Sequence, residues 1–329
     1  MELPGVFKPI AGSSQFGVWS LEFIWCLVFG VWCFTLVFGV WSFSIVSQPL
    51  HNLLLLIPAY NEEKRIGPVL REFGEYFQRE FPGRFQLVVV TNGCRDNTLG
   101  VVQEAGKQFP FIRALNFPEP IGKGGALIEG FKLAGTADLI GYVDADGATS
   151  PETFHAIVRR LDEAGVDCVI GSRWLPESVL RQTQTKIRQF ISRGFHFIVE
   201  ALFWMGIKDT QCPAKVVRRV AIEAVHPFLR IADLSFDVNL VYALKHAGFT
   251  VMEFPIEWTD KLGSKVTQSL ARSSLVMFLS VVRLRLFYSP LYRWLKPLRP
   301  IEGWLYLKLR APLRRTETLP GKQGHRPAS

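Results

Sequence analysis

Two aspartates separated by one residue are the part of this sequence best suited to chemistry. The stretch "LIGYVDADGATS", residues 139–150, begins as an apolar run and then presents Asp144 and Asp146. Carboxylates at the end of a buried strand can turn toward one point, and such oxygen ligands suit Mg²⁺ or Mn²⁺ that also bind phosphate oxygens. Ser150 and Pro151 already provide a helix start, so capping does not explain Asp144. The pair predicts a metal site for a substrate that carries a diphosphate.

The glycine-rich stretch "GKGG", residues 122–125, could bind an anion. It is expected to open a helix, where backbone N–H groups and the Lys123 ammonium can meet negative charge. The spacing of a P-loop is absent, and no GxGxxG follows the first expected strand, which argues against a dinucleotide-binding dehydrogenase.

Apolar runs that alternate with helical patterns must position these residues. The expected strands are "NLLLLIP", "FQLVVVTN", "FIRAL", "DLIGYV" and "DCVIGSR". Such alternation predicts right-handed βαβ units and a mostly parallel α/β sheet with helices on both faces. Ligands bind beyond the carboxyl ends of strands in such sheets. We therefore expect residues 58–62, residues 92–96, the two aspartates and residues 171–173 to lie on one rim.

The N-terminal extension, residues 1–49, contains a segment long enough to cross a membrane. Residues 23–46 are all apolar, small or hydroxyl-bearing, and at ~1.5 Å per residue they would form roughly 36 Å of helix. The repeated "GVW" makes the segment low in complexity, so a translation start further along the chain is an alternative. The length of the run disfavours a cleaved signal peptide.

The C-terminal segment, residues 266–329, carries the basic excess of the chain, with 12 Lys and Arg against two acids. Residues 50–265 form the expected catalytic domain. Ser269, Arg272, Ser273, Ser280 and Arg283 follow a helical spacing, which predicts an amphipathic helix lying in a membrane interface. The alternative is a helix packed on its own domain. Basic residues beside apolar ones favour an anionic membrane over nucleic acid as partner.

The five cysteines form no CxxC pair, which fits a reducing cytosol.

An ordered set of motifs is similar to that of a known enzyme family. Over about residues 50–290 the set runs "LIPAYNEEKRI", "VVVTNGCRDNT", "IGKGGALIEGFKLA", "YVDADGAT", "GSR", "DTQCPAK", "LSFDVNLVYALKHAGF" and "PIEWTDKLGSKV". It resembles family 2 glycosyltransferases of the polyprenyl-phosphate type, most of all the dolichyl-phosphate β-glucosyltransferases. The resemblance implies a GT-A fold and inverting transfer of a hexose from a nucleotide sugar to dolichyl or polyprenyl phosphate at the cytosolic membrane face. UDP-glucose is the favoured donor, and GDP-mannose is the alternative.

The resemblance also implies roles for individual residues. The expected nucleotide-binding set is Pro58, Ala59, Tyr60, Glu62, Asn92, Gly93, Lys123 and Asp144. The expected catalytic set is Asp146, Arg173, Arg193, Lys215 and Asp237. Asp144 and Asp146 would hold Mg²⁺ or Mn²⁺, and Arg173, Arg193 and Lys215 would face the acceptor phosphate. Asp237 would either orient the acceptor or cap a helix near Ser235.

Three departures from the family pattern leave alternatives open. "TNGC" stands where "DDGS" is usual, Pro213 and Ala214 replace glycine and an aromatic residue, and Asn239 replaces glutamate. A phosphate acceptor is already largely a dianion at neutral pH, so transfer of a sugar to it needs no base. One alternative is transfer to another acceptor, with Asp237 or Asp209 as base. Another is a nucleotide-sugar-binding membrane protein without catalytic activity.

Overall fold

The computed structural model describes residues 51–180, 186–259 and 270–289. The expected membrane segment within residues 1–49 lies outside these ranges, as does the basic tail from residue 290. Among the described residues, no helix is both long and apolar enough to cross a bilayer. The division of the chain at residues 50 and 266 stays a prediction.

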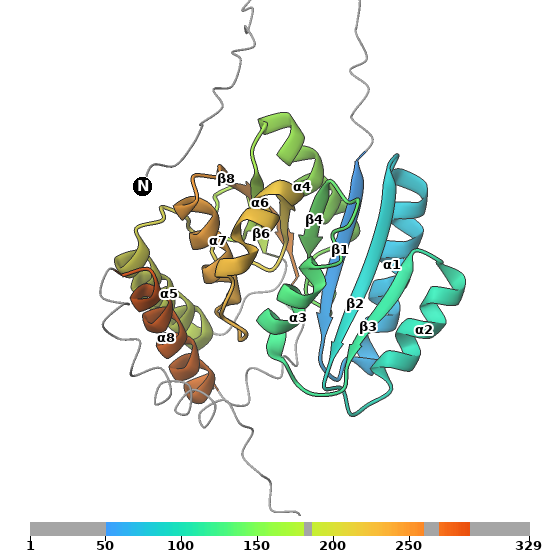
Figure 1. Cartoon of the computed structure of the whole chain (residues 1–329), viewed down its shortest axis with the longest axis horizontal. Coiled ribbons are helices and arrows are strands. Elements are labelled where there is room, and N and C mark those ends of the chain that lie inside the picture. Colours follow the sequence, from blue (N-terminus) through green and yellow to red (C-terminus); the bar gives the residue numbers. More distant parts are fainter. Residues whose placement is uncertain (1–50, 181–185, 260–269, 290–329) are drawn as a thin grey trace, which may run out of the picture. The chain divides into compact units, whose positions relative to one another are not determined.

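A seven-stranded sheet forms the centre of the domain (Figure 1). Its strand order is β3-β2-β1-β4-β7-β5-β8, and all strands are parallel except β7, which pairs antiparallel with β4 and β5. The strands are β1 (Asn52–Ala59), β2 (Arg84–Asn92), β3 (Ile112–Phe117), β4 (Leu139–Tyr142), β5 (Cys168–Ser172), β7 (Lys215–Arg218) and β8 (Val251–Pro255). Strands β6 (Val179–Leu180) and β9 (Glu257–Trp258) form a separate parallel pair. The expected mostly parallel sheet is confirmed, although the sequence analysis missed β7 and β8.

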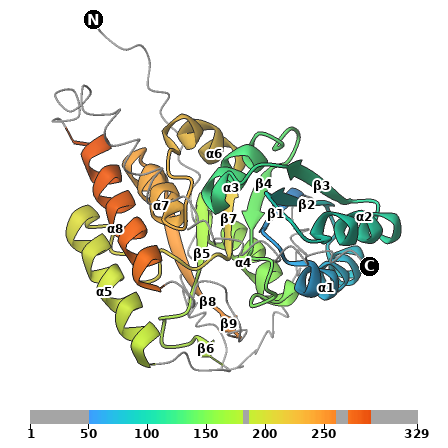
Figure 2. The same cartoon turned by 90° about the horizontal axis from the view of Figure 1, so that it is seen from below.

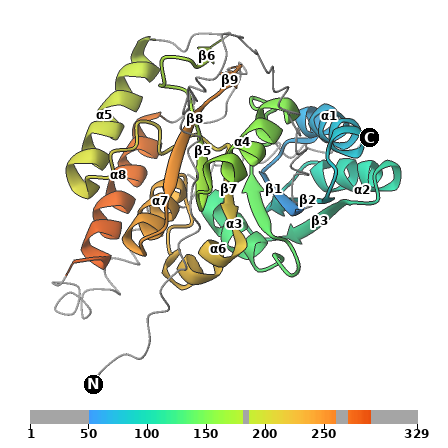
Figure 3. The same cartoon turned by 90° about the horizontal axis from the view of Figure 1, so that it is seen from above.

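Helices cover both faces of the sheet (Figures 2 and 3). One layer contains α1 (Glu63–Glu80), α2 (Thr98–Gln108) and α4 (Pro151–Ala164). The other contains α3 (Gly122–Phe131), α6 (Arg219–Val225), the short 3₁₀ helix η1 (His226–Phe228) and α7 (Phe236–His246). Because β1 lies between β2 and β4 and under both layers, residues 53–57 are buried as a continuous apolar run.

Local sequence signals set the start and end of α4, the helix that follows the paired aspartates. The Ser150 hydroxyl accepts a hydrogen bond from the Thr153 amide at 3.2 Å, and Pro151 occupies the first turn. Gly165 ends the helix with φ of 63°. The expectation that Ser150 and Pro151 start this helix is confirmed, which leaves Asp144 free of any capping role there.

Two helices of 18 residues, α5 (Lys186–Phe203) and α8 (Leu270–Phe287), lie side by side next to this domain. Helix α8 also contacts α7. The expected polar stripe of α8 does not face outward as a whole. Ser280 is fully buried and donates to Asp233 at 2.5 Å, because the loop before α7 supplies a carboxylate there.

The outward side of α8 carries Arg285 together with several apolar side chains. Leu275, Phe278 and Leu286 are each at least 40% exposed, whereas Val281 and Leu284 are buried against the domain. The helix therefore packs on its own domain, as the alternative interpretation held, but with a mostly apolar outer side. Of the expected polar stripe, the structure describes the side chains of Ser280 and Arg283, and Ser280 is turned toward the domain. The expected position of this helix in a membrane interface stays a prediction.

Candidate active site

Parallel pairing places the carboxyl ends of β1, β2, β4 and β5 at one edge of the sheet. Strand β7 runs the opposite way, so it begins at the edge where its neighbours end. Its first residue, Lys215, is paired with Tyr142 on β4 and with Ile170 on β5. The expected rim thus exists, and β7 adds a lysine to it that the strand-end argument had not located.

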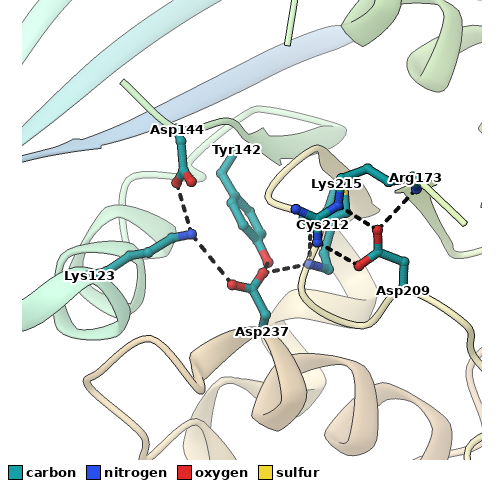
Figure 4. A network of polar contacts seen from close by, with 8 residues as sticks. All are labelled: Lys123, Tyr142, Asp144, Arg173, Asp209, Cys212, Lys215 and Asp237. Carbon is teal, nitrogen blue, oxygen red and sulfur yellow. Dashed lines mark hydrogen bonds and ion pairs between the residues drawn. The ribbon is translucent and has the colours of Figure 1, made fainter. Parts of the chain in front are cut away.

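Asp237 is the centre of a polar network at this rim (Figure 4). Its Oδ1 accepts from the Tyr142 hydroxyl and from the Lys215 ammonium, each at 2.5 Å, and its Oδ2 lies 3.5 Å from Lys123 Nζ. Asp237 lies in the first turn of α7, but Ser235 at the cap position receives no side-chain capping bond. The contacts of the Asp237 carboxylate are thus with Tyr142 and two lysines, and its expected part in orienting the acceptor stays a prediction.

The environment of Asp237 keeps it ionised. Burial alone would raise its pKa, but the charges of Lys123 and Lys215 and the hydrogen bonds from Lys215 and Tyr142 outweigh burial, so the pKa is lowered. Burial, followed by the charge of Asp237, raises the pKa of Tyr142, which stays a neutral hydroxyl donor. Asp237 is thus a fixed negative charge that organises lysines from α3 and β7.

Lys123 links this network to the first of the paired aspartates. Its ammonium lies 2.8 Å from Asp144 Oδ1, and the side chain of Asp144 is 35% exposed. Burial lowers the pKa of Lys123, but the charges of Asp144 and Asp237 outweigh burial and raise it, so the lysine is cationic. The rim therefore presents a cation between an open carboxylate and a buried one.

Asp146 lies in the turn after β4, where its Oδ1 accepts from the Ala148 amide at 3.0 Å. Burial, and next the charge of Asp144, raises its pKa. Two carboxylates that repel one another in this way favour a divalent cation between them. Within the described ranges, no group of three or more His, Cys, Asp and Glu side chains could hold a metal. Two carboxylates still fit Mg²⁺ or Mn²⁺, which take their other ligands from water and phosphate oxygens.

The first turn of α3 does not present its backbone N–H groups to a ligand as expected. The Gly122 amide donates to Asn92 Oδ1 at 3.1 Å, and the Gly124 and Gly125 amides donate to the Ala232 carbonyl at 3.0 and 3.3 Å. These donors are taken because the loop before α7 packs onto the helix start. Three of the four amides in "GKGG" are thus occupied, and the Lys123 ammonium is the charged group that this stretch brings to the rim.

Asn92 has a structural role at the same helix start. Its Oδ1 accepts from the Ile121 amide at 2.7 Å as well as from Gly122. Gly93 follows with φ of 64°, and a Cβ there would lie 2.8 Å from the Pro120 nitrogen. The Asn92 side chain is buried. An amide keeps the acceptor that α3 needs, which explains how asparagine replaces the usual aspartate. Whether Asn92 and Gly93 also contact a nucleotide stays a prediction.

Arg173, at the end of β5, is held by Asp209. Its Nε and Nη2 donate to the two carboxylate oxygens at 2.7 and 2.9 Å, and its backbone amide donates at 3.0 Å. The guanidinium also lies 5.1 Å from the ring centre of Trp258. Burial would raise the pKa of Asp209, but Arg173 outweighs it and the pKa is lowered. Asp209 thus takes two of the five guanidinium donors. The expected contact of Arg173 with an acceptor phosphate stays a prediction.

The remaining expected residues lie in different environments. Lys215 is fully buried, with its ammonium bound to Asp237 and the Cys212 carbonyl, so it does not face an acceptor as expected. Lys215 is buried because it lies on β7, between β4 and β5 in the sheet. Arg193 is exposed on α5. Its part in acceptor binding stays a prediction.

The residues after β1 lie on the rim. Tyr60 is exposed and Ala59 is buried, while Pro58 is half-buried. The Glu62 carboxylate pairs with Arg65 through bonds of 2.7 and 2.8 Å. Their proximity to a nucleotide stays a prediction.

Two side chains make contacts at the rim that the sequence did not indicate. Tyr142 looked like part of an apolar strand, and Asp209 was considered only as a base rather than as the partner of Arg173. A tyrosine two residues before paired aspartates was the available signal for the first. The second had no local signal, because the partners are 36 residues apart.

Comparison with known proteins agrees with this geometry. The model of the family "Glycosyl transferase family 2" matches residues 55–225. The chain belongs to glycosyltransferase family 2. It is 32% identical over 243 residues to a dolichyl-phosphate beta-glucosyltransferase of Trichomonas vaginalis, covering 71% of this chain and 70% of the relative. It is 31% identical over 255 residues to the dolichyl-phosphate beta-glucosyltransferase of Saccharomyces cerevisiae, covering 72% and 75%.

A solved structure supports the fold. Glucosyl-3-phosphoglycerate synthase from Mycobacterium tuberculosis, in complex with Mn²⁺, UDP-glucose and phosphoglyceric acid, superimposes with a TM-score of 0.54 at 15% identity, covering 71% of this chain and 80% of that one. The family 2 chain described here is therefore a glycosyltransferase with a GT-A-like fold.

Proposed function

We propose that this glycosyltransferase moves a glucosyl residue from UDP-glucose to dolichyl or a related polyprenyl phosphate, with inversion at the anomeric carbon. GDP-mannose is the alternative donor. The observation that carries the proposal is the ion pair of 2.8 Å between Lys123 and Asp144, at a sheet edge that Asp146 and Arg173 also follow. The relatives that cover most of the chain act, by name, on dolichyl phosphate.

The reaction exchanges one bond for another at the anomeric carbon. An oxygen of the acceptor phosphate forms the new carbon–oxygen bond while the bond to the nucleoside diphosphate breaks. The acceptor phosphate has a second pKa near ~6, so it is largely a dianion at neutral pH and attacks without losing a proton. The negative charge that it gives up appears on the departing diphosphate. The protein must therefore align the reactants and stabilise that charge.

The residues of the rim divide between these two tasks. Asp144 and Asp146 would hold the divalent cation, which when bound offsets charge on the diphosphate. Lys123, at the same place, adds a second positive charge toward the leaving group. Arg173, fixed by Asp209, is suited to the acceptor phosphate because a guanidinium matches phosphate oxygens.

A mechanism that needs a carboxylate base has weaker support. A base works best when its pKa lies near the operating pH. The pKa values of Asp209 and Asp237, the two candidate bases, are instead lowered by neighbouring cations. Each carboxylate is also bound by at least two donors. These contacts favour a phosphate acceptor over a neutral hydroxyl.

We also place the enzyme at the cytosolic face of a membrane. The outward apolar residues of α8 support membrane contact, as do Phe197 on α5 and Trp204, which are 73% and 84% exposed. Cys94, Cys168 and Cys212 are free thiols, as a reducing compartment would allow.

The test is a transfer assay with membranes that contain the full chain. They are supplied with radiolabelled UDP-glucose or GDP-mannose and with dolichyl phosphate, and the lipid product is identified. We expect a glucosyl phospholipid that forms with UDP-glucose and Mg²⁺ or Mn²⁺. Label that enters only water-soluble or protein-linked products would contradict the proposed acceptor.

A further inference from the structure

Lys123 lies between two carboxylates of different accessibility. Its Nζ is 2.8 Å from Asp144 Oδ1 and 3.5 Å from Asp237 Oδ2. The Asp144 side chain is 35% exposed and that of Asp237 is 2% exposed. A cation arriving from solvent can therefore reach Asp144, whereas Asp237 is closed to it.

The position of Lys123 conflicts with metal binding at Asp144. The ammonium already uses one oxygen of the carboxylate that a divalent cation would approach, and two cations at one carboxylate repel one another. Lys123 has a second anchor, because Asp237 lies on its other side and is itself fixed by Tyr142 and Lys215. The flexible lysine side chain can shift toward Asp237 without leaving the rim.

We propose that Lys123 is a resident counter-cation of Asp144 that couples metal binding to donor binding. It opposes a divalent cation that arrives alone, because that cation must displace the ammonium. When a nucleoside diphosphate arrives with the metal, Lys123 moves from Asp144 to the phosphate oxygens and favours the ternary complex. The inference rests on the proposed function, since it assumes that a metal and a nucleotide sugar bind at this rim.

This coupling predicts that Lys123 weakens the binding of metal alone and strengthens the binding of nucleotide in the presence of metal. Removal of the ammonium frees Asp144, so the metal alone should bind more tightly. The same removal takes a cation away from the diphosphate, so the nucleotide should bind more weakly in the presence of metal. A lysine that only maintained the structure would change both affinities in the same direction.

The experiment uses the purified full chain in detergent with Lys123→Met. Mn²⁺ alone is titrated by calorimetry or electron paramagnetic resonance, and UDP is titrated at saturating Mn²⁺. We expect Mn²⁺ alone to bind about tenfold more tightly than to the wild-type chain, and UDP with Mn²⁺ to bind about tenfold more weakly, each equivalent to about 1.4 kcal/mol.

Two further variants control for charge and for folding. Lys132→Met removes an ammonium after the other end of α3, where Lys132 pairs with Glu129 at 2.8 Å, and it should leave both affinities unchanged. Lys123→Arg keeps a cation and should restore much of the UDP affinity.

The possible failures are distinguishable. If Lys123→Met weakens both affinities, or leaves Mn²⁺ binding unchanged while wild-type membranes still transfer glucose, the coupling inference is overturned and the proposed function stands. If the wild-type chain neither binds Mn²⁺ nor transfers glucose, both are overturned.

Discussion

At the residue scale, each rim carboxylate has a different task set by its neighbours. Asp237 and Asp209 are buried and paired with cations, so their charges hold other side chains in place. Asp144 is partly open, and Asp146 carries a raised pKa because of burial and of Asp144. The carboxylates suited to a metal are thus the two whose charges the protein does not fully neutralise.

Asp146→Asn should lower glucosyl transfer by more than about 100-fold, because a neutral amide is a poor ligand for a hard divalent cation. The chain should stay folded, since the amide oxygen can still accept from the Ala148 amide. Transfer assays and thermal unfolding measure the two effects. Asp138→Asn, which neutralises an exposed carboxylate just before β4, is the matched control and should keep activity. Near-normal transfer by Asp146→Asn would remove this residue from the metal site.

The Arg173–Asp209 pair should shape the acid stability of the domain. The lowered pKa of Asp209 in the folded chain means that the unfolded chain binds more protons between that pKa and about 3.9, so stability rises with pH there. The contribution is present above about pH 4 and is lost as pH falls through the folded pKa. Asp209→Asn should therefore show a shallower acid slope in urea unfolding and a lower stability at pH 7, by roughly 3–5 kcal/mol.

The control for this prediction is again Asp138→Asn, whose exposed carboxylate accepts a hydrogen bond from the Asn52 amide at 2.9 Å. It should retain the slope of the wild-type chain. Equal acid slopes for Asp209→Asn and wild type would show that the pair does not contribute to acid stability.

At the element scale, the loop before α7 connects the rim with α8. The Ala232 carbonyl accepts from the first turn of α3, while Asp233 and Ser235 bond to Ser280 and to the Met277 carbonyl. The close approach at α3 requires glycine, because a Cβ on Gly124 would lie 2.3 Å from the Ile231 carbonyl oxygen. The start of α3, and with it Lys123, is positioned by this contact.

Adjacent glycines test this packing. Gly124→Ala should destabilise the domain by roughly 1–3 kcal/mol because backbone atoms must move. Gly125→Ala has its nearest contact, the Ile121 Cβ, at 3.2 Å, and alanine favours the helix, so its stability should stay within about 1 kcal/mol of wild type. Chemical denaturation measures both. A Gly124→Ala chain as stable as Gly125→Ala would show that the loop does not fix this helix start.

The outer side of α8 should contribute to membrane binding through apolar residues. In chains that begin at residue 48, Phe278→Ser combined with Leu286→Ser should reduce co-sedimentation with anionic liposomes severalfold, because less apolar surface inserts. Val220→Ser together with Leu133→Ser, at exposed sites on or next to α6 and α3, is the matched control. High salt should weaken the remaining binding, since it screens basic residues. Equal binding by both double variants would contradict a membrane role for this side.

At the scale of the whole molecule, the alternating apolar runs were enough to predict the parallel sheet and the shared rim. Residues 53–57 and residues 87–90 are continuous apolar runs that are buried in the sheet. Their short length and apolar character identified them as strands. Strand β7 escaped because "KVVR" has only four residues and begins with a lysine, which breaks the apolar pattern. The orientation of α8 escaped because the buried partner of Ser280 comes from a loop 47 residues away.

The site was predictable only as far as it depends on strand ends. Asp144 lies in the turn after β4 and Arg173 follows the last residue of β5, so topology placed them on the rim. The ion pairs that give them their roles join residues far apart in sequence, such as Lys123 and Asp237, 114 positions apart. Pairing of residues so far apart in sequence depends on tertiary packing, which local sequence patterns do not reveal.

In the proposed reaction the acceptor is itself a phosphate dianion, so that transfer needs no carboxylate base. The most direct measurement is the pH dependence of kcat/KM for purified full chain with dolichyl phosphate, beside the same assay with dolichol. We predict transfer to dolichyl phosphate only, with an acid limb near pH ~6 that reflects the second ionisation of the acceptor phosphate. Transfer to dolichol at a comparable rate would contradict the account, because that hydroxyl must lose a proton to a base.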